Sequence, residues 1–102
     1  MPFQHGQLKY SVGIHRRVAQ QNDLVFATFV NSCVFRHING NFGDLDEFDI
    51  EANRIAVETG GERIMSSYIS QELAVKIWII TSVDRTETLI TTPEEYQSKG
   101  NL

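Results

Sequence analysis

Residues 36–49 hold the densest group of chemically capable side chains in this chain. A basic pair, Arg36 and His37, is followed by two glycines on either side of Phe42 and then by a run of acids: Asp44, Asp46, Glu47 and Asp49, with Glu51 just beyond. Glycines let a backbone turn sharply or approach a neighbour closely. The acids could cap a helix, hold a cation or imitate phosphates. Each of these three interpretations implies a different function.

A metal site is one interpretation of this segment. His37, Asp44 and Asp49 combine imidazole and carboxylate ligands, which suit Mn, Fe or Zn. A calcium loop of the EF-hand type starting at Asp44 fails, because Asp49 stands where that loop needs glycine and Ile55 where it needs glutamate. The simplest explanation of the acids is structural, because negative charge is favoured at the start of a helix.

Cys33 and His37 are four residues apart and would share one face of a helix. That pair could supply two zinc ligands or a thiolate with its base. Core packing is the better explanation, because a free cysteine on an apolar face is usually a small buried hydrophobic residue. The sequence has no Gly-x-Ser-x-Gly elbow, no Walker loop and no dinucleotide-binding fingerprint, so no enzyme motif is present.

Three helices are expected to position these residues, at 11–22, 23–38 and 44–59. Ser11 can cap the first, and Asn22 or Asp23 can cap the second. In the third, Asp44 is the expected cap, with Glu47 completing a capping box. An apolar stripe on the third helix is expected to face the core, and Gly60 and Gly61 are expected to end it; the stripe comprises Leu45, Phe48, Ala52, Ile55 and Thr59.

Three strands are expected at 63–70, 75–82 and 86–92, because these segments are rich in β-branched and aromatic residues and are joined by short turns. Residues 94–96 would form a turn of helix or an ordered tail after Pro93. The predicted fold class is α+β, with three helices packed on one face of a three-stranded antiparallel meander. The predicted core is Phe26, Phe29, Val30, Cys33, Phe48, Ile55, Ile64, Ile77, Trp78 and Ile79.

The composition predicts one globular domain, 1–102, with an apolar share of 41% and a charged share of 22%. The net charge of −4 argues against a general nucleic-acid binder, which normally carries a basic excess. A single cysteine and the lack of a secretory pattern favour a reducing cytoplasm, and no apolar run is long enough to span a bilayer. We expect no cofactor, and a monomer or small homo-oligomer.

Several motifs together resemble a family of small proteins of plasmids, integrative elements and prophages, often called plasmid-related proteins or restriction-modification subunits. The resemblance spans roughly residues 13–96. It is carried by Arg36-His37, Gly40-Asn41-Phe42-Gly43-Asp44, Asp49 with Asn53, residues 63–68, residues 77–81, Asp84-Arg85 and residues 93–96. The family pattern has Gly-Asp-Trp-Gly-Asp, so Asn41 and Phe42 are departures that remove a carboxylate and an indole. The resemblance implies a genomic setting in which small accessory proteins block host restriction or CRISPR systems.

The favoured hypothesis is therefore a non-enzymatic inhibitor of a host nucleic-acid-processing defence complex, acting in the cytoplasm of a bacterial host. It would bind a protein rather than nucleic acid, through an acidic surface with an apolar anchor. The expected contact residues are Phe42, Asp44, Asp46, Glu47, Asp49 and Glu51. The alternative hypothesis is a small metal-dependent hydrolase or nuclease that uses His37, Asp44 and Asp49.

Overall fold

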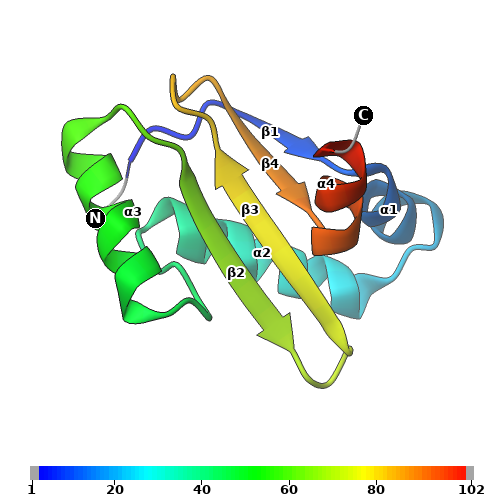
Figure 1. Cartoon of the computed structure of the whole chain (residues 1–102). Helices are drawn as coiled ribbons and strands as arrows, with labels where there is room; N and C mark the ends of the chain where they lie inside the picture. Colours follow the sequence, from blue (N-terminus) through cyan, green and yellow to red (C-terminus); the bar gives the residue numbers. More distant parts are fainter. Residues whose placement is uncertain (1–2, 101–102) are drawn as a thin grey trace.

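The second half of the chain forms the antiparallel meander that its β-branched residues predict. In the computed structural model, which describes residues 3–100, the strands are β2 (Ile64–Ser70), β3 (Val75–Thr81) and β4 (Glu87–Thr91). Both ends of each strand lie within one residue of the predicted bounds. β2 pairs with β3 and β3 with β4, both antiparallel (Figure 1).

A fourth strand at the start of the chain was missed from the sequence. β1 (Gln7–Tyr10) pairs in parallel with β4, so within residues 3–100 the sheet is four-stranded and mixed, in the order β1-β4-β3-β2. The strand is four residues long and carries two polar side chains, Gln7 and Lys9, which is too little pattern to predict a strand. β1 and β2 are the two edges of the sheet.

The first predicted helix is shorter and less regular than expected. α1 (Val12–His15) is followed by a π-helical segment, η1 (Arg16–Gln20), instead of one helix through residue 22. Ser11 caps α1 as predicted, accepting from the N–H of Ile14 at 3.4 Å. At the other end of the chain, the predicted turn of helix is α4 (Pro93–Gly100).

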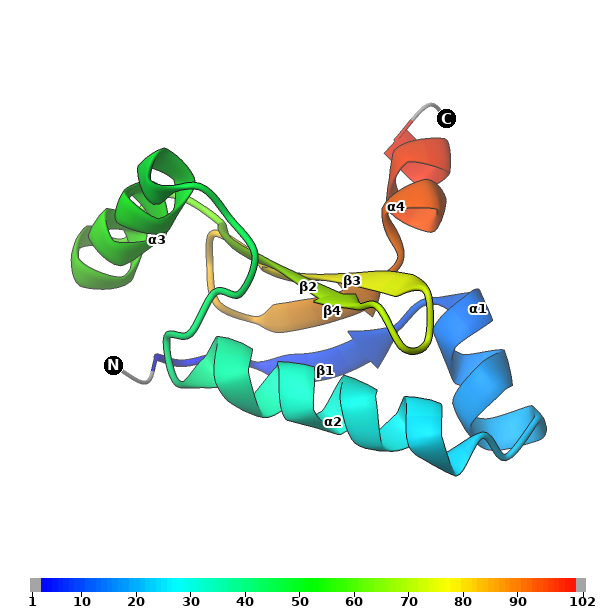
Figure 2. The ribbon, with the colours of Figure 1, turned by 90° about the horizontal axis from the view of Figure 1, so that it is seen from below.

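The second predicted helix is confirmed as α2 (Leu24–Ile38), and Asp23 is its cap. The third is α3 (Glu47–Thr59), which ends at Gly60 as predicted but starts three residues later than expected. Figure 2 shows α2 along one face of the sheet, with α3 and α4 rising at opposite ends of the other side. The expectation that all three helices cover one face is therefore wrong for α3.

The main core lies between α2 and the sheet. Phe26, Val30 and Cys33 of α2 are buried against Ile77 and Ile79, as the sequence predicts. Ile64 is also buried, in a smaller cluster beside α3. Phe29 is only partly buried, and so is Trp78, which lies in edge-to-face contact with Tyr96 of α4 at 6.0 Å between ring centroids.

Two predicted core residues lie on the surface. Phe48 is 79% exposed and Ile55 is 49% exposed. Both belong to α3, whose position is set by the contacts described in the next section. None of the helices within residues 3–100 is long and apolar enough to cross a membrane.

Candidate functional site

The loop of residues 40–43, which we call the glycine loop, precedes α3 and lies along the outer edge of β2. The N–H of Ser67 donates to the carbonyl of Phe42 at 3.2 Å, and the N–H of Asp44 donates to the carbonyl of Ser67 at 2.6 Å. Gly43 lies between these bonds with φ +78°, and a Cβ there would be 2.2 Å from the Ser67 carbonyl oxygen. Only glycine allows this close approach. The role of Gly43 is therefore to let the loop backbone hydrogen-bond to the edge of β2.

Asp44 binds the same strand edge instead of capping α3. Its carboxylate accepts from the N–H of Ile69 at 2.9 Å. The cap of α3 is Asp46, whose carboxylate accepts from the N–H of Asp49 at 2.8 Å. The predicted cap at Asp44 and capping box with Glu47 are wrong, because the backbone at residues 43–44 is held in the sheet and cannot yet start a helix.

Asn53 fixes the rotation of α3 about its own axis. Its side-chain amide donates to the carbonyl of Met65 at 2.6 Å and accepts from the N–H of Met65 at 3.1 Å. An amide that pairs with both backbone groups of one residue imitates a neighbouring strand. With Asn53 and Ala56 buried, the interior face of α3 is one residue away from the predicted Ala52 and Ile55, a rotation of about 100°.

This rotation turns the predicted core stripe of α3 outward. Phe48, Ala52 and Ile55 lie on the surface of the helix instead of in the core. The stripe was visible in the sequence, but its orientation was not, because the face of α3 that meets β2 is the one with Asn53 and Ala56 and not the apolar stripe.

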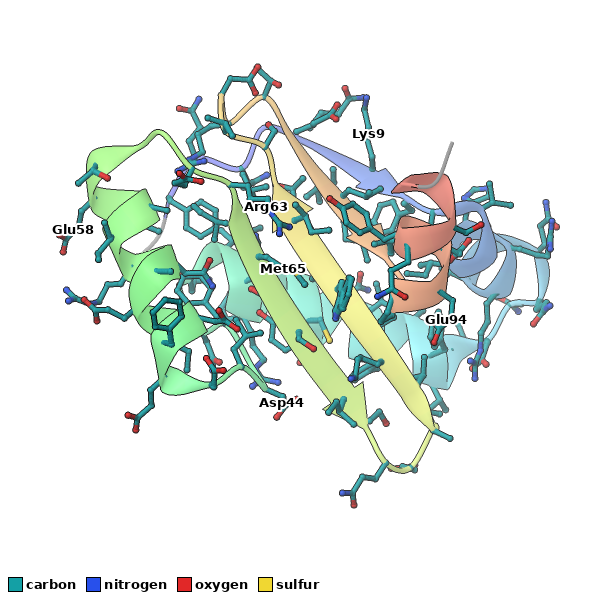
Figure 3. The ribbon with its side chains drawn as sticks, viewed as in Figure 1. Lys9, Asp44, Glu58, Arg63, Met65 and Glu94 are labelled. Atoms are coloured by element: carbon teal, nitrogen blue, oxygen red, sulfur yellow. The ribbon has the colours of Figure 1, made fainter. Side chains whose placement is uncertain are left out.

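An open groove of about 530 Å³ lies between α3 and the start of β2. It is mostly apolar and carries charged groups of both signs; its lining comprises Leu45, Asp49, Ala52, Asn53, Ile55, Glu62, Arg63 and Met65. In Figure 3, Met65 lies over the sheet and Glu58 on the outer side of α3. The groove thus adjoins the exposed stripe of α3.

The acids around this groove divide into engaged and unengaged groups. Glu51 and Glu58 both pair with Arg54, and the Arg54 guanidinium beside Glu51 lowers the pKa of that carboxyl. In the part of the chain that the structure describes, the carboxylates without a hydrogen-bond or ion-pair partner near the groove are Glu47, Asp49 and Glu62. The free negative charge is therefore smaller than the sequence predicts, and it includes Glu62, which the sequence did not single out.

Arg85 anchors the far end of α3. Its guanidinium donates to the carbonyls of Ala56 at 2.9 Å and Glu62 at 2.8 Å. A cation at the C-terminal end of a helix is favoured by the helix dipole. The neighbouring Asp84 accepts from the hydroxyls of Ser82 and Thr86. α3 is thus held at its start, middle and end by Asp44, Asn53 and Arg85.

Phe42, the predicted anchor, is not available at the surface. It is 7% exposed and packs with Ala56 and Ile64 under α3. Phe48 is the exposed aromatic residue on this side of the molecule, and sequence reasoning had assigned it to the core.

His37 is a core residue and not a surface ligand. It is fully buried, with Nδ1 hydrogen-bonded to Ser66 and Nε2 to Thr81 at 2.8 Å. Burial, together with the nearby His5, lowers the pKa of His37 to about 3. Burial also raises the pKa of the Cys33 thiol to about 12. Neither side chain is accessible as a base or nucleophile.

The structure does not unite the residues of the hypothetical metal site. His37 is engaged at both ring nitrogens, and Asp44 is engaged at the β2 edge. Among the described residues, no group of three histidine, cysteine, aspartate or glutamate side chains has the arrangement to hold a metal ion.

No protein-family model, curated protein or solved structure matches the chain. The function is therefore inferred from the geometry of the α3 side of the molecule and from the resemblance found in the sequence.

Proposed function

We propose that the protein is a non-enzymatic inhibitor from a phage or another mobile element, and that it binds a protein of a host nucleic-acid-processing defence complex, of the CRISPR or restriction type. The binding surface is the outward face of α3 with the groove beside it. The observation that carries the proposal is the exposure of Phe48, at 79%, beside carboxylates that have no partner of their own.

An apolar anchor surrounded by charge is the usual composition of a selective protein interface. Phe48 and Ile55 can enter an apolar pocket on the partner, while Asp49 and Glu62 meet basic side chains at its rim. A groove lined with lysine and arginine, of the kind that holds nucleic acid, has the complementary charge. The net charge of −4 is too small for an entire surface that imitates DNA, so the acidic contact is local.

The rigidity of α3 supports this role. The helix is tied to β2 through Asn53 and to the following turn through Arg85. A helix that is already held in place loses little conformational freedom when a partner binds, so more of the contact energy appears as affinity.

Affinity capture from a lysate of the natural host, with partners identified by mass spectrometry, tests the proposal. We expect Phe48→Ala and the double variant Asp49→Lys, Glu62→Lys to lose the partner that the parent protein captures. The control is Glu72→Lys, Glu94→Lys, which makes the same change of net charge at exposed acids away from α3. It should capture the partner as the parent does.

The effect of salt gives a second criterion. Binding should weaken as salt rises, because the acidic contacts are exposed to screening, and it should be insensitive to chelators. If the Asp49 and Glu62 double variant, folded by circular dichroism, binds as tightly as the parent at low salt, the acidic α3 face is not the binding surface.

A further inference from the structure

The outer face of α2 carries no charged side chain. Its large apolar residues are strongly exposed: Leu24 by 70%, Val25 by 60% and Phe35 by 69%. Between them lie the small or uncharged residues Thr28, Asn31 and Ser32, also exposed. A helix on the surface of a globular protein normally presents charged residues to water. A charge-free face with three large apolar side chains is typical of a surface that another protein covers.

The order of side chains along α2 matches itself when it is reversed. The large apolar residues stand at both ends of the face, with Thr28 and Ser32 in the middle. A two-fold axis near residues 29 and 30 would place Phe35 of one copy over Leu24 and Val25 of the other. The same axis would place Thr28 of one copy opposite Asn31 and Ser32 of the other. An interface with two-fold symmetry requires this kind of self-complementarity.

The middle of the face permits close approach. The hydroxyl of Thr28 donates to the carbonyl of Leu24 at 2.9 Å, within its own helix. Its hydroxyl is therefore already hydrogen-bonded without a partner protein. Small side chains at the crossing point let two helices approach within the usual interaxial distance of about 8 to 10 Å, while Phe35 fills the space at each end.

We propose that the protein forms a symmetric homodimer in which two copies of α2 pack antiparallel through this face. Charge favours a second copy as the occupant. Each chain carries a net charge of −4, so two copies repel one another overall, and this repulsion is least where they meet through a surface without ionised side chains, such as the outer face of α2. The inference does not depend on the proposed function.

The size of the face indicates how strong the dimer is. Six exposed side chains on each helix correspond to a total buried area on the order of 1,000 Å², the lower limit for a specific interface. We therefore expect a dimer that forms and dissociates with concentration. Figure 2 places α2 on the side of the sheet away from α3, so the dimer leaves both copies of the groove open.

Sedimentation equilibrium of the full chain tests the dimer. Over a range from about 10 µM to about 1 mM, the mean mass should rise from the 11.6 kDa of one chain towards twice that value. Phe35→Glu and Val25→Glu should stay at the mass of one chain. Phe48→Glu is the matched control, because it makes the same substitution at an exposed phenylalanine on another helix, and it should dimerise as the parent does.

Disulfide trapping tests the arrangement of the helices. In an equal mixture of Thr28→Cys and Ser32→Cys variants, the share of mixed disulfide-linked dimers should rise well above the share that random pairing of two equal populations gives. The native Cys33 is fully buried, which keeps its thiol out of this reaction.

The proposal is wrong if the parent remains at 11.6 kDa up to 1 mM, in which case the face is left for a different protein. It is equally wrong if Phe35→Glu dimerises with the affinity of the parent. A folded monomer of Phe35→Glu, shown by circular dichroism, together with a dimeric Phe48→Glu supports it.

Discussion

Asp44 and Asp46 are two residues apart and stabilise different elements. Asp44 accepts from the edge of β2, and Asp46 accepts from the first turn of α3. The residue type is suitable for either role, and the difference comes from where the backbone leaves the sheet. At the residue scale, the acids before α3 are therefore divided between holding the fold and facing solvent.

Replacing Asp46 by alanine should lower the free energy of unfolding by about 1 kcal/mol, because the N-terminal cap of α3 is lost. Urea denaturation followed by circular dichroism measures the change. Glu47→Ala is the control, because its side chain has no partner among the described residues, and it should change stability by less than about 0.5 kcal/mol. Equal losses for the two variants would contradict the assignment of Asp46 as the cap.

Asn53→Leu should cost more, about 2 kcal/mol, because it leaves both backbone groups of Met65 without the partner that the amide provides. The comparison is Ala52→Leu, on the exposed side of the same turn, which should be nearly neutral. Hydrogen exchange at Met65 locates the effect, and it should speed up in Asn53→Leu alone. An unchanged exchange rate at Met65 would show that the amide does not protect the strand.

His37 should make stability depend on pH. The unfolded chain binds a proton near pH 6.5, whereas the buried side chain has a pKa of about 3, so the unfolded state holds more protons between these values. The free energy of unfolding should be highest above pH 6.5 and fall towards pH 3, with a slope approaching about 1.4 kcal/mol per pH unit.

Denaturant melts between pH 7 and 5 measure this slope in a window above the usual titration range of carboxylates. His37→Gln, which has no imidazole to protonate, should flatten it. A parent protein whose stability is constant across this window would contradict a neutral, buried His37.

At the scale of elements, the sequence predicts a helix or strand and its buried face best when many residues of the segment indicate the same face. β2, β3 and α2 were located correctly because long runs of apolar or β-branched side chains agree with one another. The buried face of α3 was not predicted, since the contacts of Asn53 and Ala56 outweigh the apolar stripe. β1 was missed because its pairing with β4 joins residues about eighty positions apart and leaves no local pattern.

The candidate site was predicted only in part. The sequence predicted that the acidic segment lies at the start of the third helix. Asp49 is exposed, as a contact residue must be. The anchor changed from Phe42 to Phe48, because the glycine loop binds β2 and draws Phe42 inward with it. Glu62 belongs to the site through the fold, since it follows the C-terminal end of α3 and lies outside the acidic segment at its start.

The two ends of the chain stabilise one another through Glu95. Its carboxylate, on α4, accepts from the hydroxyl of Ser11 at 2.7 Å and from the N–H of Gly13 at 2.8 Å, at the start of α1. Glu95→Ala should lower the free energy of unfolding by about 1 to 2 kcal/mol. Hydrogen exchange should increase across residues 12–20 and stay unchanged in α2. Its exposed neighbour gives the control, Glu94→Ala, which should have no such effect.

At the scale of the whole molecule, α2, with its charge-free face, and α3, with its acidic face, lie on different sides of the sheet (Figure 2). A dimer would therefore present two binding surfaces at once. On a sensor surface densely coated with the captured partner, the parent should dissociate at least about tenfold more slowly than Phe35→Glu, because both sites engage. On a sparse surface the two should dissociate at the same rate. Equal rates on both surfaces would contradict bivalent binding.

The edges of the sheet differ in a way that limits how chains can aggregate. Along β2, the outward backbone groups of Met65, Ser67 and Ile69 meet Asn53, the glycine loop and Asp44. Along β1, the N–H groups of Gln7 and Ser11 point to β4, so the alternate residues direct theirs away from it, towards the open side of the strand. A sheet with one sealed edge can add a neighbouring strand only once. Strand-to-strand joining of folded chains therefore stops at a pair, and growth into a fibril needs α3 to detach first.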